Sequence, residues 1–191
     1  NIFFLTLMIV NFKKKFSIIH IPKTGGTSIK KSIIKEKLEK DIYFFHKKLH
    51  VYPEFYKKTK EINIKLKYSH LTFSDLDFFY PEIFSKIKDF NFYAAVRNPN
   101  ERFISSLIQY FGEKKIDLSR IDNFMMNKLI HDIIFEIKND KFLNDISLFS
   151  FKRQYEYIFY NNEQIVKNIY KTQNLNKLIE DLNSEYGIYF D

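Results

Sequence analysis

The sequence predicts an α/β protein with a central, mainly parallel sheet flanked by helices. Short apolar runs that end in turn residues alternate along the chain with longer segments of helical periodicity. Strands that alternate with helices are usually joined by crossovers, which leave the strands parallel. The 191 residues contain no repeat and no linker rich in Gly, Ser or Pro, so residues 1–191 are expected to form one domain.

The first strand is expected at Phe16–Ile21, an apolar run followed by Pro22 and the neighbouring glycines Gly25 and Gly26. A helix is expected to start near Thr27. Its apolar residues recur at helical spacing among lysines and glutamates: Ile29, Ile33, Ile34 and Leu38. The order is therefore strand, glycine turn, helix.

The same order returns in the middle of the chain. The apolar run Phe92–Val96 predicts a second strand, which ends at Asn98 and Pro99. The helix behind it is expected to end at Gly112, which would cap it. Its apolar face consists of Phe103, Ile104, Leu107, Ile108 and Phe111. Periodicity predicts a further helix at Phe124–Ile137.

The C-terminal part predicts one more strand and one more helix. The strand is expected at Ile165–Tyr170, and the helix after it is expected to end at Gly187. The apolar positions of this helix are Leu175, Leu178, Ile179 and Leu182. The segments 40–67 and 139–154 show no clear pattern.

The composition favours anionic partners and excludes cysteine chemistry. The net charge is +8, and a basic surface attracts nucleic acid, acidic glycans, phosphorylated or sulfated small molecules, or membrane headgroups. A general need for solubility in a lysine-rich protein explains the same charge. The chain has no cysteine, which removes disulfides, thiolate metal sites and cysteine nucleophiles together.

The segment Ile2–Val10 is strongly apolar and precedes Lys13, Lys14 and Lys15. A membrane span needs about 20 apolar residues, so this run is too short to cross a bilayer. Residues 1–12 are interpreted either as an N-terminal extension, such as an anchor remnant that would allow membrane association, or as a buried strand. The compartment stays open, with a cytoplasmic or membrane-associated location favoured, or the Golgi lumen if the source is eukaryotic.

The turn at residues 23–28 is predicted to bind a phosphate or sulfate. The chain has 4 glycines, where average usage would give roughly 13, and two of them lie here. A turn between a strand and a helix N-terminus points unpaired N–H groups outward, and glycine lets an anion approach them closely. The predicted binding residues are Lys23, Thr24, Gly25, Gly26, Thr27 and Ser28. The alternative is an ordinary turn in which Thr27 or Ser28 caps the helix.

The order of these residues distinguishes between kinds of anion site. In the nucleotide P-loop a lysine follows the last glycine, whereas here Lys23 precedes the glycines and Thr27 follows Gly26. The run P-K-T-G-G-T-S instead resembles the 5′-phosphosulfate loop of sulfotransferases that use 3′-phosphoadenosine 5′-phosphosulfate (PAPS). It is most similar to the glycan group of that family, which includes heparan sulfate 2-O-like and Golgi-type carbohydrate sulfotransferases.

A second segment strengthens the resemblance. The family holds the ribose 3′-phosphate with a strand-loop-helix motif of the form R-[DN]-P-x-x-R-x-x-S, and Val96–Ser106 reads VRNPNERFISS. Arg97, Arg102 and Ser105 fall on this motif in register. An arginine fork suits a phosphate, and Ser105 lies one helical turn beyond Arg102. The resemblance implies that Arg97 and Ser105 bind the 3′-phosphate and that Arg102 has a structural or supporting role.

The segment Tyr68–Phe79 lies between these motifs and resembles the family segment that carries the general base. The matching residue is His70, and an unperturbed imidazole titrates near pH 6.5. The alternative is an ordinary surface or core histidine, since the chain has 5 of them. His20 also matches the family loop and is interpreted as loop support.

The resemblance implies a P-loop NTPase-like sulfotransferase fold and transfer of the sulfuryl group of PAPS to a hydroxyl of an acceptor, expected to be a carbohydrate. The expected catalytic residues are His70 as base and Lys23, which neutralises charge on the leaving phosphate oxygen. The expected binding residues are those of the turn with Arg97 and Ser105. No metal and no nucleic-acid partner are expected.

Three other interpretations remain. One is a relative that keeps the fold and has lost activity, which the intact Lys23, Arg97 and Ser105 argue against. A P-loop kinase or other phosphotransferase would share the fold and the anion turn. A non-enzymatic binder of nucleic acid or acidic polymer would use the net positive charge and the many Tyr and Phe residues. The roles of Gln154, which matches a recurrent family glutamine, and of Gln173, where an acidic residue is usual, stay open, as do the acceptor and the oligomeric state.

Overall fold

The computed structural model describes residues 8–26, 28–29, 43–44, 70–139 and 146–187. Its main sheet has five strands in the order β3-β1-β2-β4-β7. These strands are β1 (Ile9–Asn11), β2 (Phe16–Ile19), β3 (Tyr43–Phe44), β4 (Asn91–Val96) and β7 (Asn168–Lys171). The three strands β2, β4 and β7 are parallel, whereas β1 is antiparallel to both β2 and β3. The prediction of an α/β fold with a mainly parallel sheet is confirmed, with an antiparallel extension at one side.

The antiparallel extension comes from the apolar N-terminal segment. Ile9 and Val10 are buried in β1, and Lys15, with a φ of 52°, takes the left-handed backbone of the turn into β2. The part of this segment that the structure describes is therefore a strand of the sheet, and residues 1–7 lie outside the described residues. In the described part of the chain, the helices fall short of the length and apolar character that a membrane span requires.

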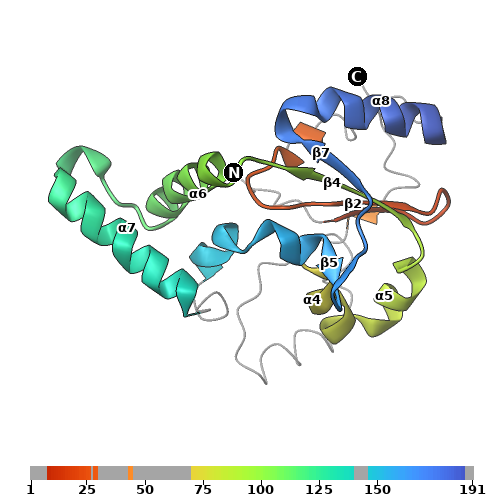
Figure 1. Cartoon of the computed structure of the whole chain (residues 1–191), viewed down its shortest axis with the longest axis horizontal. Helices are drawn as coiled ribbons and strands as arrows, with labels where there is room; N and C mark the ends of the chain where they lie inside the picture. The colour runs from red at the N-terminus through yellow and green to blue at the C-terminus, as the bar shows by residue number, and fades with distance from the viewer. Residues whose placement is uncertain (1–7, 27, 30–42, 45–69, 140–145, 188–191) are drawn as a thin grey trace.

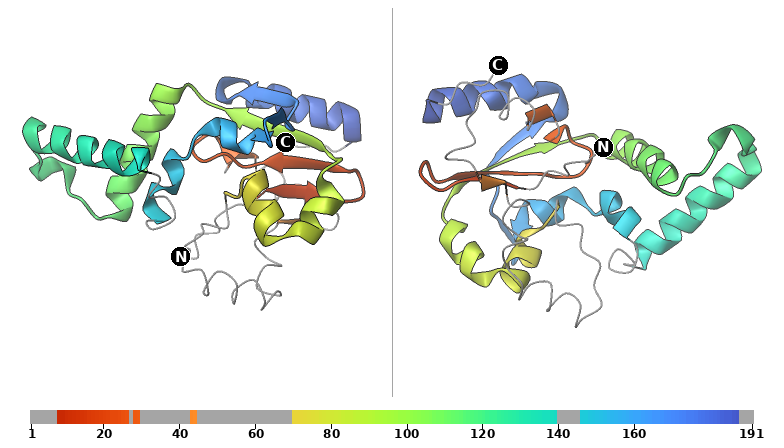
Figure 2. Two further views of the ribbon diagram at one scale, coloured as in Figure 1. Left: turned by 60° about the horizontal axis from the view of Figure 1, so that its bottom comes forward. Right: turned by 180° about the vertical axis from the view of Figure 1, so that it is seen from behind.

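Helices cover both faces of the sheet, as Figures 1 and 2 show. One face carries α8 (Leu175–Tyr186), and the other carries α4 (Phe73–Phe79) and α5 (Pro81–Ile87). Side chains alternate along the strands accordingly, so that Tyr93 packs toward α8 while Phe92 and Ala94 pack toward α4 and α5. This alternation gives a three-layer α/β arrangement with one apolar core on each side.

A helical arm projects from the sheet. It consists of α6 (Pro99–Glu113) and α7 (Asn123–Lys138), with the short 3₁₀ helix η2 (Leu118–Arg120) between them (Figure 1). The arm has its own small core, which it shares with the 3₁₀ helix η4 (Ile146–Phe151). The remaining elements are η5 (Gln154–Tyr157), the hairpin of β5 (Phe159–Tyr160) and β6 (Glu163–Gln164), and η6 (Thr172–Asn174).

Most predicted elements that fall on the described residues are present, although the strand expected at Ile165–Tyr170 is Asn168–Lys171 and one helix end is wrong. The expected helix positions Ile33, Ile34 and Leu38 lie outside the described residues. The predicted C-terminal helix ends at Gly187, whose φ of 60° is the left-handed cap expected of glycine. Gly112, by contrast, lies inside α6, which continues to Glu113. The left-handed residue there is Lys115, with a φ of 55°. The prediction that Gly112 caps α6 is therefore wrong.

Candidate active site

The predicted site residues follow the carboxyl ends of three neighbouring parallel strands. The glycine turn follows β2, Arg97 follows β4, and Thr172 follows β7. Because parallel strands all end at the same edge of a sheet, these three loops meet there. This is the edge at which open α/β sheets usually bind their ligands.

A single hydroxyl connects the three strand ends. Thr172 Oγ1 lies 3.0 Å from the carbonyl oxygen of Val96 and 3.5 Å from that of Thr24. Val96 is the residue before Arg97, and Thr24 follows Lys23. The main chains that carry the two predicted cationic groups are therefore held next to each other by one side chain.

The glycine pair is required by close packing on both sides. A Cβ on Gly26 would lie 2.1 Å from Cδ2 of His20, and a Cβ on Gly25 would lie 2.7 Å from Cδ1 of Leu175. Gly25 also has a φ of 88°, which side-chain-bearing residues rarely adopt. Helical geometry starts at Gly26, and the amide of Ser28 donates to the carbonyl of Gly25 at 2.9 Å. The predicted strand, glycine turn and helix start are all present.

The side chains of the turn differ in what they can offer to an anion. Lys23 is half-buried and has a φ of 66°, an unfavourable backbone conformation for a residue with a Cβ. The Thr24 hydroxyl is buried and donates to the carbonyl of Ile21 at 2.9 Å. It is thus used inside the turn, which leaves the main chain of Thr24 as its contribution to a ligand. Ser28 is exposed, and Thr27 lies outside the described residues.

Arg97 is held at both its main chain and its side chain. Its amide donates to Gln154 Oε1 at 2.9 Å, and Gln154 Nε2 donates to its carbonyl at 2.8 Å. The guanidinium Nε lies 3.1 Å from a carboxylate oxygen of Glu101, one turn along α6. The Arg97 side chain keeps 31% of its surface exposed. It therefore presents an ordered cation at the strand end.

Arg102 and Ser105 have different surroundings on α6. Arg102 is buried and donates to the carbonyls of Ser150 and Lys152, at 2.8 and 3.0 Å. Burial lowers the pKa of its guanidinium. These contacts are the structural role expected of Arg102. Ser105 is half-buried in the first half of the helix, whose N-terminus is capped by Asn98.

His70 lies next to the glycine turn. Its Nδ1 is 3.0 Å from the carbonyl oxygen of His20, and the two imidazole rings pack edge to face with centroids 4.5 Å apart. After His70 the chain enters α4, where Thr72 and Asp75 form a capping box. Lys152 lies 3.1 Å from Asp75 and fixes this helix start to the segment before η5. The base candidate and the anion turn therefore belong to one packed unit.

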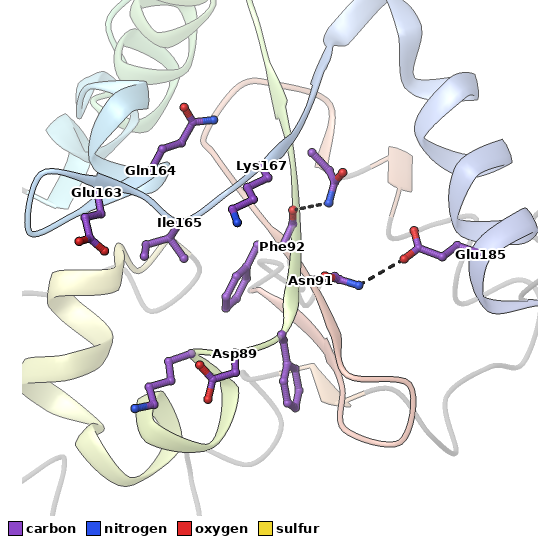
Figure 3. Close-up of a pocket in the computed structure, with 11 residues that line it drawn as sticks. Asp89, Asn91, Phe92, Glu163, Gln164, Ile165, Lys167 and Glu185 are labelled. Atoms are coloured by element: carbon purple, nitrogen blue, oxygen red, sulfur yellow. Dashed lines mark hydrogen bonds between the residues drawn. The ribbon is translucent and has the colours of Figure 1, made fainter.

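A large cavity lies at the other end of the parallel strands, next to the amino ends of β4 and β7. Its volume is about 580 Å³, and it is lined by the first residues of β4 and β7, including Asn91 and Asn168. Figure 3 shows Asp89, Glu163 and Lys167 around it, with Glu185 of α8 hydrogen-bonded to Asn91. No predicted site residue lines it. Among the residues that the structure describes, no group of three or more His, Cys, Asp or Glu side chains could hold a metal ion.

Sequence reasoning missed the residues that hold this site together. Thr172 and Gln154 bond to main-chain atoms from distant parts of the chain. From the sequence, Gln154 is only a match to a recurrent family glutamine, and its contact with Arg97 is not predicted. The signal for Thr172 was its position two residues after the end of the predicted strand Ile165–Tyr170. Gln173, whose role was open, is exposed and lies in η6.

Comparisons with known proteins agree with the motifs. A model of the sulfotransferase family matches residues 6–158, which is most of the chain and includes the glycine turn, His70, Arg97 and Ser105. Searches of curated proteins and of solved structures gave no significant match. With the family model covering both motifs and the strand ends that carry them, the chain belongs to the sulfotransferase family.

Proposed function

We propose that this protein transfers the sulfuryl group of PAPS to a hydroxyl of an acceptor, with a carbohydrate as the expected acceptor class. The observation that carries the proposal is the junction made by Thr172, whose hydroxyl lies within hydrogen-bonding distance of the carbonyls next to Lys23 and Arg97. A donor nucleotide with a 5′-phosphosulfate and a 3′-phosphate needs two groups of cationic and N–H donors close together. The two strand ends offer such a pair.

In this proposal the glycine turn binds the 5′ end of the donor. The N–H groups at the helix start, with Ser28 and Thr27, hold the 5′-phosphate, and the positive end of the helix dipole favours its charge. The main chain of Thr24, Gly25 and Gly26 lets the phosphate approach. Arg97 and Ser105 hold the 3′-phosphate, for which the guanidinium exchanges its contact with Glu101 for one with the ligand.

The transfer itself is an in-line displacement. A bond forms between the acceptor oxygen and sulfur while the bond between sulfur and the bridging phosphate oxygen breaks, and adenosine 3′,5′-bisphosphate leaves. His70 takes the proton of the acceptor hydroxyl, and Lys23 neutralises the charge that develops on the bridging oxygen. The remaining contribution of the protein is positioning, as in phosphoryl transfer.

The acceptor class is supported by charge. A net charge of +8 suits an acidic saccharide, and the sequence motifs resemble the glycan group of the family. A P-loop phosphotransferase would need a lysine directly after the last glycine, whereas Lys23 precedes both glycines and Thr27 follows Gly26.

Calorimetry with adenosine 3′,5′-bisphosphate tests the donor without knowledge of the acceptor. The full chain is expected to bind this product and to lose most of its affinity in Arg97→Ala, while ATP with Mg²⁺ binds far more weakly. Tighter binding of Mg²⁺-ATP would identify a phosphotransferase instead. Salt-sensitive binding of nucleic acid without affinity for the bisphosphate would identify a nucleic-acid binder.

A further inference from the structure

The side chain of Gln154 continues the sheet beyond the end of β4. The last parallel pairs of β4 are Ala94 with Ile19 of β2 and Val96 with Lys171 of β7. Arg97 therefore lies three residues past the ladder with β2 and one residue past the ladder with β7. At this point the amide of Gln154 accepts from the Arg97 N–H at 2.9 Å and donates to the Arg97 carbonyl at 2.8 Å. A side-chain amide thus makes the two hydrogen bonds that a neighbouring strand would make.

The segment that carries Gln154 is itself fixed to α6. Arg102 donates to the carbonyls of Ser150 and Lys152, and the Ser106 hydroxyl donates to that of Ser150 at 2.9 Å. Gln154 lies two residues after Lys152, at the first position of η5. Helix α6, which begins after Arg97, therefore also holds the segment that carries Gln154, the partner of Arg97.

We infer that Gln154 is a positioning residue that sets the direction of the Arg97 guanidinium at the donor site. Arg97 lies between the end of a strand and Asn98, the cap of α6, where neither the sheet nor the helix fixes its main chain. The two bonds to Gln154 fix it instead, and an ordered guanidinium binds a phosphate without first losing conformational freedom. This inference rests on the proposed function, in which Arg97 holds the 3′-phosphate.

The test is Gln154→Met, which keeps the length of the side chain and removes both hydrogen bonds. The matched control is Gln164→Met, because Gln164 also donates from its amide to a main-chain carbonyl, that of Val166, but lines the cavity at the other edge of the sheet. Calorimetry with adenosine 3′,5′-bisphosphate is expected to show affinity weakened about ten-fold in Gln154→Met, as two neutral hydrogen bonds imply, and unchanged affinity in Gln164→Met.

A double-mutant cycle separates positioning from general destabilisation. In an Arg97→Ala background, Gln154→Met is expected to weaken binding no further, because Gln154 acts through Arg97. In turnover assays the KM for PAPS is expected to rise while kcat at saturating PAPS changes little. An equal loss of affinity in both backgrounds would show a merely structural role and overturn the inference.

Amide hydrogen exchange provides a readout that needs no ligand. The Arg97 amide is expected to exchange faster in Gln154→Met than in the wild type, with Gln164→Met unchanged at that amide. Unaltered exchange at Arg97 would overturn the inference even if the bisphosphate binds. Failure of the wild type to bind the bisphosphate would overturn the proposed function. Slower exchange of the Arg97 amide in the wild type than in Gln154→Met would still support the contact with Gln154. Should Gln154→Met not fold, Gln154→Asn, which is too short to make both bonds, replaces it in each measurement.

Discussion

The Nδ1 atom of His70 lies 3.0 Å from the carbonyl oxygen of His20. A carbonyl oxygen only accepts, so Nδ1 of His70 carries the proton and, in the neutral ring, Nε2 carries the lone pair. The ring of His20 meanwhile fills the space in which a Cβ of Gly26 would lie. One residue thus sets the tautomer of the candidate base through its carbonyl and packs against the anion turn through its ring.

Replacement of His70 by alanine is expected to stop transfer and to spare donor binding. Without a base, kcat is expected to fall about 10²–10⁴-fold, and the acid limb of the pH–rate profile should disappear, because protonation of the imidazole no longer limits the rate. The matched control is His131→Ala, which removes an exposed histidine of α7. Near-normal kcat in His70→Ala, with the acid limb retained, would exclude His70 as the base.

Lys23 is expected to lower the stability of the fold through its strained backbone while its charge is needed for transfer. Its φ of 66° lies in the left-handed region, which costs a residue with a Cβ about 1–2 kcal/mol. Lys23→Gly is therefore expected to raise the unfolding free energy while transfer is nearly abolished, since the charge on the leaving oxygen is no longer neutralised. Lys115→Gly is the control, because Lys115 has a φ of 55° at the end of α6, away from the glycine turn.

Thermal unfolding and turnover are measured for both Lys23→Gly and Lys115→Gly. Both variants should be more stable than the wild type, and only Lys115→Gly should remain active. A fully active Lys23→Gly would show that the lysine has no part in the reaction.

The order of strand, glycine turn and helix was predictable because it depends on neighbours in the chain. The apolar run Phe16–Ile19, the glycines after it and the helical spacing of α8 are all local signals. The same holds for Arg97 and Ser105, which lie on matching elements of a contiguous motif. The position of Arg97 at the same edge of the sheet as the glycine turn then follows from the parallel pairing of β2 with β4.

The remaining features of the site depend on contacts between residues that lie far apart in the sequence. Whether Thr172 meets Val96 or Gln154 meets Arg97 is decided by tertiary packing, and no spacing in the sequence records it. The error at Gly112 has a similar origin. Phe111, directly before this glycine, is buried in the core of the arm, and the helix continues to Glu113. The left-handed conformation is at Lys115.

The two glycines Gly26 and Gly112 are expected to respond to alanine in opposite directions. A Cβ at Gly26 would lie 2.1 Å from the His20 ring, so Gly26→Ala must displace that ring and with it the support of His70. At Gly112 nothing lies within 4 Å of a new Cβ, and alanine inside a helix is favoured by about 0.5–1 kcal/mol. Gly26→Ala should lose activity and stability, while Gly112→Ala should gain stability and keep activity, as measured by turnover and chemical denaturation. Stability equal to the wild type in Gly26→Ala would contradict the close packing.

Thr172→Val removes the hydroxyl that joins the strand ends and keeps the shape of the side chain. The carbonyl of Val96 then loses its donor at 3.0 Å, and the unfolding free energy is expected to fall by about 1–2 kcal/mol. Affinity for adenosine 3′,5′-bisphosphate should weaken as well, because the turn and Arg97 are no longer held together. Thr172→Ser retains the hydroxyl and should restore both properties. A variant that loses stability but binds the bisphosphate normally would restrict Thr172 to a structural role.

Glu156 is expected to destabilise the folded protein at neutral pH. Burial raises the pKa of its carboxyl and outweighs the opposing attraction of Lys152, whose amine lies 3.9 Å away and pairs with Asp75 at 3.1 Å. A folded pKa above the unfolded one means that the protonated form is favoured by folding. The stabilisation of the folded protein by protonated Glu156 is complete below the unfolded pKa of about 4.5. It is lost as the pH rises through the raised pKa of Glu156 in the folded protein. Glu156→Gln, which keeps the size and removes the charge, should therefore match the wild type in thermal unfolding near pH 4 and exceed it near pH 7. A variant that is less stable than the wild type at neutral pH would show that the ion pair with Lys152 outweighs the cost of burial.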